Sequence, residues 1–230
     1  MRFLLFTITF FGFLQNTQAV AQNNAVVVEL FTSQGCSACP PADEILRELA
    51  ARDDVIALAL HVDYWDYIGW VDVFGSAENT ARQQAYARAA QATSVYTPQM
   101  IVGGIDQLVG SRAMQVMQTL NEHSRVKQAF DLRLTRSADG LLIRADPGVP
   151  GTYDVQMVRY VPSQTVDIRR GENAGRAFDY ANVVTSWDVL GQWNGVTPLE
   201  MRAAADGPDP VVVIIQKAGQ GAIVAAARLR

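Results

Sequence analysis

Apolar residues in the first half of the chain follow two periods, one typical of buried strands and one typical of helices. The valine-rich run that begins at Val26 and the run over residues 55–62 are almost continuously apolar, as in strands covered on both faces. Between them, residues 43–51 place three apolar side chains on one face of a helix, namely Ile45, Leu46 and Leu49. Strand, helix and strand at this length predict a right-handed βαβ unit.

Two more helices and a hairpin are expected before residue 125. Residues 76–91 are rich in alanine and other helix formers, and Ser76 is placed to cap this helix. Pro98 cannot donate to a ladder, so it marks the first residue of the apolar strand that follows, and its peptide bond is a candidate for the cis form. Gly103-Gly104 predicts the hairpin turn, and Ser111 is expected to cap the last helix.

From about Lys127 the pattern changes to short strand-like segments separated by turn residues. Asp139-Gly140 is a hairpin signal, and further strand candidates are residues 153–161, 165–169, 182–189, 211–216 and 222–229. Some seven short strands in roughly 100 residues predict a β-sandwich. The charged segment over residues 169–176 is interpreted as a solvated hairpin tip, with a loop that binds an anion or a partner protein as the alternative.

The N-terminus has the pattern of a cleaved signal peptide. Arg2 precedes an apolar run of about 12 residues, which is shorter than the ~20 needed to span a membrane. Ala19-Val20-Ala21 is an A-x-A cleavage site, so residues 1–21 are predicted to be removed, with an uncleaved anchor as the alternative. We expect a periplasmic or secreted protein without stable membrane insertion, in a compartment where disulfides persist.

The length and charge of the chain limit the number of domains and the kinds of partner that can be expected. Removal of the signal peptide leaves about 209 residues, enough for one large domain or two small ones. The net charge is −4, and no basic patch is interleaved with aromatic residues, so nucleic acid is not an expected partner. Neither feature determines the oligomeric state.

The only two cysteines, Cys36 and Cys39, follow the first strand at the expected start of a helix. Pro40 and Pro41 fit only in the first turn of that helix, which places Cys36 just ahead of it and exposed, and Cys39 inside it and shielded. Free N–H groups at a helix N-terminus stabilise a thiolate, which favours a redox dithiol. The alternatives are a structural disulfide and half of a zinc site, for which the chain offers only two histidines. No metal is predicted.

An aromatic and acidic loop follows the second strand over residues 63–75. Exposed aromatic side chains near a reactive group are typical of a substrate-binding rim, and Tyr64 and Trp65 are the candidates. The alternative is that these side chains pack the loop onto the body of the protein.

The order βαβαββα, with Cys-x-x-Cys after the first strand and Thr97-Pro98 before the third, resembles the thioredoxin fold. More closely, the phrase Glu-Leu-Phe-Thr-Ser-Gln-Gly-Cys-Ser-x-Cys-Pro-Pro-Ala-Asp is similar to an exported bacterial family of thioredoxin-like proteins of unknown function. Later phrases match the same family, namely Arg170-Gly171-Glu172-Asn173, Asn182-Val183-Val184 and Gly191-Gln192-Trp193. The resemblance implies a thioredoxin-like domain over residues 22–124 and an all-β sandwich-like domain over residues 125–230.

The resemblance also implies roles for single residues. Cys36 matches the attacking cysteine, and Cys39 matches the resolving cysteine. Pro98 matches the cis-proline, beside which the backbone of Thr97 would pair with a substrate strand. Glu29 lies near the place where thioredoxins keep a buried carboxylate beneath the dithiol, although the loop is one residue longer here; the alternative for Glu29 is an outward-facing strand residue.

The dipeptide Ser37-Ala38 stands where thioredoxins have Gly-Pro, which leaves the reduction potential open. These two residues complete the predicted substrate-binding set with Thr97, Tyr64 and Trp65. The resulting hypothesis is an exported thiol–disulfide oxidoreductase that needs no cofactor and acts on protein thiols and disulfides or on glutathione-like thiols. The alternative is a binding module on a thioredoxin-like scaffold whose disulfide is static.

Overall fold

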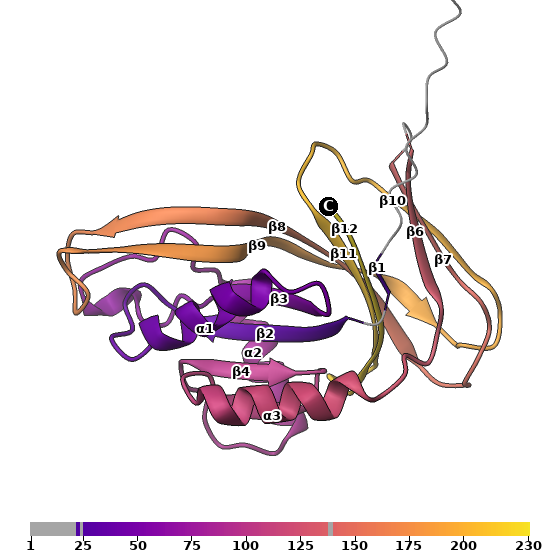
Figure 1. The fold of residues 1–230 in the computed structure, drawn as a ribbon, viewed down its shortest axis with the longest axis horizontal. Coiled ribbons are helices and arrows are strands. Elements are labelled where there is room, and N and C mark those ends of the chain that lie inside the picture. Colours follow the sequence, from indigo (N-terminus) through magenta and orange to yellow (C-terminus); the bar gives the residue numbers. More distant parts are fainter. Residues whose placement is uncertain (1–21, 24, 138–139) are drawn as a thin grey trace, which may run out of the picture.

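The computed structural model describes residues 22–23, 25–137 and 140–230. The predicted signal peptide and Asp139 of the predicted hairpin turn lie outside these residues. The helical elements of the described part are α1 (Pro40–Ala50), α2 (Ala77–Ala89), α3 (Ala113–Ser124) and the short 3-10 helix η1 (Asp66–Ile68) (Figure 1). Its strands are β1 (Gln22–Asn23), β2 (Val26–Thr32), β3 (Val55–His61), β4 (Gln99–Val102), β5 (Asp106–Val109), β6 (Leu132–Ser137), β7 (Gly140–Ala145), β8 (Tyr153–Ile168), β9 (Arg176–Trp193), β10 (Leu199–Ala203), β11 (Val211–Lys217) and β12 (Ile223–Leu229).

The first half has the predicted βαβαββα order and is roughly thioredoxin-like. Strand β2 pairs in parallel with β3, so that Thr32 at the end of β2 lies opposite His61 at the end of β3. Strand β4 pairs antiparallel with β2, and β5 pairs antiparallel with β4 across the predicted Gly103-Gly104 turn. The ends of β2 and β3 therefore bring the residues that follow them to one edge of the sheet.

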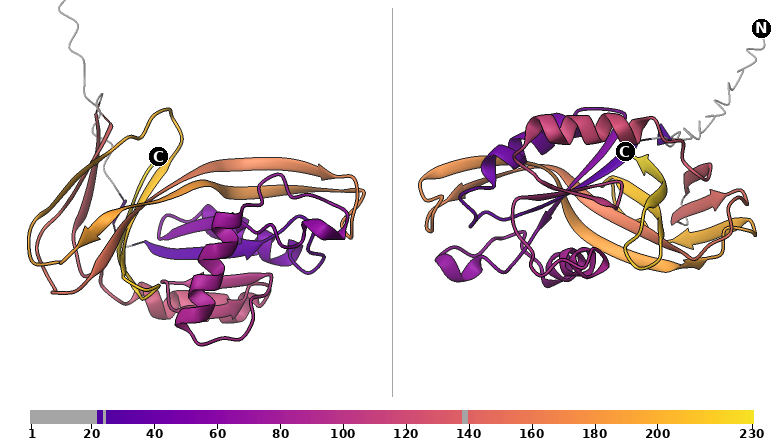
Figure 2. Two further views of the ribbon diagram at one scale, coloured as in Figure 1. Left: turned by 180° about the vertical axis from the view of Figure 1, so that it is seen from behind. Right: turned by 90° about the horizontal axis from the view of Figure 1, so that it is seen from below.

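Side chains alternate along β2 between two different cores. Val28 and Leu30 pack with α1 and α3, whereas Val27 and Phe31 pack with Tyr86 of α2. Figure 2 shows α2 crossing the face of the sheet opposite to α1 and α3. Because both faces of β2 are covered, its nearly continuous apolar run is accounted for.

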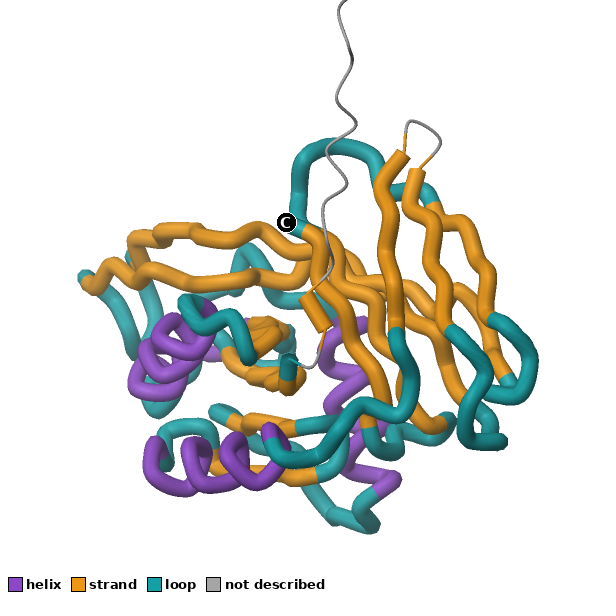
Figure 3. The backbone as a smooth tube through the Cα atoms, turned by 45° about the vertical axis from the view of Figure 1, so that its right-hand side comes forward, coloured by secondary structure: helices purple, strands orange, loops and turns teal. Residues whose placement is uncertain are grey.

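The strands of the second half do not build a separate sandwich, which corrects the predicted fold class in this respect. One nine-stranded sheet runs through the molecule in the order β1-β12-β11-β8-β9-β3-β2-β4-β5, and β9 joins β3 through a bridge between Val183 and Ala59. A second, three-stranded antiparallel sheet, β10-β7-β6, packs against β8, β11 and β12 (Figure 3). The domain boundary near residue 124 stays a prediction. The two halves share one sheet and one of the hydrophobic clusters, in which Phe31 and Tyr86 lie with Val158 and Val212.

Of the predicted helix starts, the cap of α2 is confirmed, the start of α1 lies slightly later than expected, and the cap of α3 is wrong. Cys39 is the N-cap residue of α1 rather than a residue inside its first turn, and prolines occupy the first two helical positions. The Ser76 side chain caps α2 by accepting a hydrogen bond from the Asn79 N–H at 3.1 Å. Ser111 does not cap α3: Arg112 takes the N-cap position, without a side-chain hydrogen bond. Among the described residues, no helix is both long and apolar enough to cross a membrane.

A long hairpin is the feature of the second half that reaches the candidate site. The segments predicted at residues 153–161 and 165–169 form one strand, β8, which pairs with β9 along its whole length (Figure 1). Strand β11 accompanies β8 only from Tyr153 to Arg159. Pro162 follows soon after, and a residue without an N–H suits a strand whose other edge has become free.

Candidate functional site at the Cys36–Cys39 pair

The two cysteines form a disulfide directly after β2, with their Cα atoms 5.4 Å apart. The Cys39 carbonyl begins the hydrogen bonding of α1, since it accepts from the N–H groups of Ala42 and Asp43. Cys39 is fully buried, as predicted, but the prediction that Cys36 is exposed is wrong, because only 4% of it is accessible. The exposed part of the motif is Ser37 and Ala38.

The tip of the β8–β9 hairpin contacts the backbone of the cysteine loop. The Asn173 side chain donates from Nδ2 to the carbonyl of Gln34 at 3.0 Å and to the carbonyl of Cys36 at 3.1 Å. Asn173 itself is 2% exposed. The interpretation of residues 169–176 as a solvated tip is therefore wrong for Asn173, although its neighbours Glu172 and Ala174 are exposed.

The Thr97-Pro98 bond is cis, as the sequence predicted. Gln99, the next residue, pairs with Phe31 of β2, so the cis bond lies beside the end of the strand that leads to the cysteines. The Trp65 indole donates from Nε1 to Thr97 Oγ1 at 2.7 Å. Trp65 and Thr97 are thus brought together, as two members of the predicted substrate-binding set.

The aromatic loop packs onto the body of the protein, as the alternative predicted, and exposes some of its side chains; its role as a substrate-binding rim stays a prediction. The Tyr64 hydroxyl donates to Gln83 Oε1 at 3.1 Å, which fastens the loop to α2. Burial raises the pKa of Tyr64 to about 12. Trp70 Nε1 donates to Gln34 Oε1 at 2.8 Å, which joins the loop to the segment before the cysteines. Tyr67, in contrast, is 81% exposed and stacks on Trp65.

Glu29 does not face the helix that carries the dithiol. It lies on the same side of β2 as Phe31, and its carboxylate binds Arg82 of α2 at 2.6 Å and accepts from the Tyr86 hydroxyl at 2.6 Å. The carboxylate is fully buried, so the alternative of an outward-facing side chain is also wrong. Glu29 therefore forms a buried ion pair between the sheet and α2. A different carboxyl group lies on the side of the sheet that carries the cysteines.

Asp43, four residues after Cys39, is that carboxyl group. Residues four apart share one face of a helix, so Asp43 lies one turn below Cys39 on α1. Its Oδ1 accepts a hydrogen bond from Thr32 Oγ1 at 2.8 Å. Burial raises the pKa of Asp43 to about 7, partly opposed by the charge of His61 and by the Thr32 hydrogen bond and reinforced by Asp72. The sequence signal that could have found it is the i, i+4 spacing from Cys39.

A second buried pair lies behind Asp43. His61 Nδ1 and Asp72 Oδ2 are 2.7 Å apart, and both side chains are inaccessible to solvent. Burial opposes the ionisation of Asp72, but the charge of His61 and hydrogen bonds, including one from the Gln34 N–H, outweigh it and lower the pKa of Asp72. Within the described part of the chain, His61 Nε2 has no hydrogen-bond partner, and its ring packs edge-on against Phe74 and Tyr180.

Thr32, Asp43, His61 and Asp72 therefore form a buried polar cluster beneath the cysteines. Among these residues, only His61 was a candidate from the sequence, as one of the two histidines, with His123, that could complete a zinc site. Across the described residues, no group of three or more His, Cys, Asp or Glu side chains is arranged to hold a metal ion.

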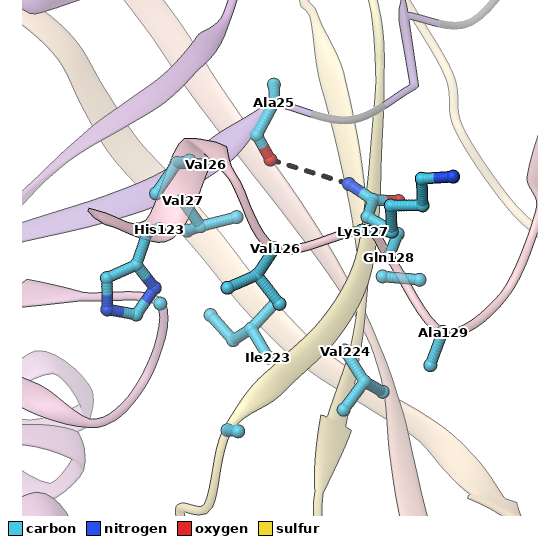
Figure 4. Close-up of a pocket in the computed structure, with 13 residues that line it drawn as sticks. Ala25, Val26, Val27, His123, Val126, Lys127, Gln128, Ala129, Ile223 and Val224 are labelled. Atoms are coloured by element: carbon cyan, nitrogen blue, oxygen red, sulfur yellow. Dashed lines mark hydrogen bonds between the residues drawn. The ribbon is translucent and has the colours of Figure 1, made fainter. Parts of the chain in front are cut away.

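A separate cavity of about 230 Å³ lies where α3, the segment after it and β12 meet. Apolar residues such as Val126 and Ile223 line it, and the Gln128 amide reaches across to the Ala25 carbonyl (Figure 4). His123 at its rim pairs with Asp106 through Nε2 at 2.6 Å. None of the residues of the cysteine site lines this cavity.

Comparison with known proteins places the whole arrangement in one family. A family model described as "Protein of unknown function (DUF1223)" matches residues 27–216, which include both cysteines, the cis-proline and the hairpin tip. The chain belongs to the DUF1223 family. A search of curated proteins finds no match.

Two solved structures are similar to this DUF1223 protein. Protein AGR_C_4864 from Agrobacterium tumefaciens is 35% identical, with 89% of this chain and 93% of that chain covered and a TM-score of 0.77. HBP35 of Porphyromonas gingivalis is 14% identical, with 90% of this chain and 75% of that chain covered and a TM-score of 0.58, so it shows the fold alone. Since the family has no established activity, the chemistry has to be argued from the site.

Proposed function

We propose that this DUF1223 protein is an exported thiol–disulfide oxidoreductase that exchanges disulfides with protein or small thiol substrates through Cys36 and Cys39. The observation that carries the proposal is the position of the pair: both cysteines lie at the N-terminus of α1, beside a cis Thr97-Pro98 bond. The positive end of the α1 dipole favours a thiolate at this position, although Pro40 and Pro41 contribute no N–H groups. Export is supported by the A-x-A site ahead of Gln22.

The exchange has two balanced steps. In the direction of substrate reduction, the Cys36 thiolate attacks one sulfur of a substrate disulfide, so that a mixed disulfide forms and one substrate thiolate leaves and takes a proton. Cys39 then loses its proton and attacks the Cys36 sulfur, which closes the Cys36–Cys39 bond and releases the second substrate thiolate. The substrate gains the two electrons that the dithiol loses, and the reverse sequence oxidises a substrate dithiol.

Asp43 is suited to accept the proton of Cys39 in the second step. It lies one turn from Cys39 on the same helix, and a carboxyl group with a pKa of about 7 can both accept and release a proton near neutral pH. Burial is the main cause of this raised pKa, and within the His61–Asp72 pair His61 opposes the rise whereas Asp72 adds to it.

The substrate would meet the exposed dipeptide Ser37-Ala38 first. The backbone of Thr97, next to the cis-proline, would pair with an extended substrate segment. Trp65, which hydrogen bonds the Thr97 side chain, and Tyr64, which anchors the loop, would shape the rim.

The second candidate is a binding module whose disulfide is static. The observation that favours it is the burial of both cysteines, since a structural disulfide is normally shielded. The two candidates differ in whether the pair equilibrates with external thiols.

The deciding experiment is the reduction potential of the Cys36–Cys39 pair, measured by thiol alkylation in graded glutathione buffers. An exchanging pair should lie between about −120 and −270 mV, whereas a pair still oxidised below about −300 mV would support the binding module. Cys36→Ser should abolish disulfide exchange, and an unchanged rate would refute the proposal. Cys39→Ser should accumulate mixed disulfides, which identify the substrates.

A further inference from the structure

We infer that the hairpin tip, residues 169–175, is a cover that must move away from the dithiol before a substrate can react, and that Asn173 holds it closed. The inference rests on the proposed function and adds to it a control of access. It starts from an apparent conflict: an exchanging cysteine must be reached by another sulfur, yet Cys36 is 4% exposed. Something that covers it has to move.

Asn173 makes the hydrogen bonds that join the tip to the cysteine loop. Among residues 169–175, all of them described, Asn173 is the one that is buried. Its amide donates to the carbonyls of Gln34 and Cys36, and its Oδ1 accepts from Arg176 at 3.2 Å, which orients the amide toward them. This contact is polar and involves the backbone of the cysteine loop itself, so it can be broken and remade without exposing an apolar core.

A second contact lies beside the first. A Cβ placed on Gly171 would come within 3.1 Å of the Trp70 Cβ, so the tip backbone rests directly on Trp70. Trp70 in turn donates to Gln34, whose carbonyl accepts from Asn173. The tip, the aromatic loop and the cysteine loop therefore meet at one point, and release of Asn173 loosens all three.

The hairpin lets its tip move while its two strands stay in place. Beyond Ser163 and Ala181, the strands pair only with each other, because β11 leaves β8 at Arg159 and β9 meets β3 at Val183. Figure 1 shows this hairpin extending past the end of β11 toward the start of α1. Ile168 is buried and Tyr180 packs against His61, so they hold the strands, and the movement is confined to residues 169–175.

The test compares the reactivity of Cys36 in three variants of the full-length mature protein. The reduced protein is alkylated with iodoacetamide, and the rate at Cys36 is followed by mass spectrometry. Asn173→Ala removes both hydrogen bonds to the cysteine loop. Gly171→Ala crowds the tip against Trp70 and strains a backbone with a φ of 76°, which an L side chain rarely adopts. Each should raise the rate about tenfold or more, the factor that corresponds to ~1.4 kcal/mol, the order of one or two lost hydrogen bonds.

Asn182→Gly is the matched control. Asn182 lies in β9, the strand that leads away from the tip, and its Nδ2 donates to the Ala57 carbonyl at 2.8 Å at the root of the hairpin. Glycine tolerates the positive φ of 48° at this position, so the substitution removes a comparable hydrogen bond without touching the tip. Its alkylation rate should stay at the wild-type value.

The outcomes separate this inference from the proposed function. Faster alkylation in the Asn173 and Gly171 variants, but not in the Asn182 variant, supports the cover. Wild-type rates in the first two variants, while the wild-type protein still exchanges disulfides, overturn the cover and leave the proposed function standing. Faster alkylation together with no exchange by any variant would keep the cover and reject the oxidoreductase. Equal acceleration in all three variants would mean general destabilisation and would also overturn the cover.

Discussion

Asp43→Asn should make the oxidised protein more stable at alkaline pH and remove most of the pH dependence of its stability. Asn has the shape of a protonated aspartate, and its Oδ1 can still accept the hydrogen bond from Thr32. The substitution therefore changes the charge of a buried group and little else. The titratable groups that face Asp43 are His61, Asp72 and Tyr180, and all remain in the variant.

The magnitude follows from the pKa of Asp43, which is 3.8 in its ordinary state and about 7 in the folded protein. Below pH 3.8 the carboxyl group is protonated in both states and costs no stability. Between these values only the folded state keeps the proton, so the free energy of unfolding falls as the pH rises. Above pH 7 both states are ionised, and at ~1.36 kcal/mol per pKa unit the full cost is about 4 kcal/mol.

The assay is urea unfolding of the oxidised wild-type and Asp43→Asn proteins at intervals between pH 4 and pH 9. The variant should match the wild type near pH 4 and exceed it by about 4 kcal/mol at pH 8. Glu48→Gln, on the exposed face of the same helix, removes the same charge and should leave the pH dependence unchanged. A difference between wild type and Asp43→Asn that stays constant from pH 5 to pH 8 would refute the reasoning.

Two further predictions concern stability elsewhere in the fold. Arg82→Ala leaves the fully buried Glu29 carboxylate without its cation, so it should lower the free energy of unfolding, measured in urea, by about 3–5 kcal/mol. Arg82→Met combined with Glu29→Gln should recover most of this loss. An equal loss in the double variant would contradict the prediction. Ser76→Ala removes the cap of α2 and should cost about 1 kcal/mol in the same assay, against a few tenths for Ser76→Gly, and equal losses would show that the hydroxyl does not matter.

Local patterns were sufficient for the elements of the first half. The start of α1 was predictable because two consecutive prolines are tolerated only in the first turn. The cap at Ser76 and the cis bond before Pro98 follow in the same way from the chemistry of one or two residues. The cap at Ser111 was predicted by the same rule and was wrong, because α3 begins one residue later than that cap implies and Arg112 takes the N-cap position.

The strands of the second half were harder to predict from the sequence, because two of them are unusually long and partly exposed. Strand β8 was divided at Pro162, which normally interrupts a strand, but one edge of β8 is free there and needs no N–H donor. The pattern of strand-like segments and turn residues over residues 153–229 indicated strands and turns correctly. It contains no information on which sheet each strand joins. Pairing of β9 with β3 is a choice between distant partners that a local period does not describe.

The amino-acid sequence by itself determined where the dithiol, the cis-proline and the aromatic loop stand along the chain, because each depends on neighbouring residues. Only the tertiary structure decided what surrounds them. Asn173 reaches Gln34 across 139 positions of sequence, and Asp43 owes its raised pKa to burial against other segments. Whether a polar side chain is solvated or buried depends on partners supplied by remote strands. For this reason Asn173, in a tip predicted to be solvated, is buried against the cysteine loop, and Asp43 is buried on its helix.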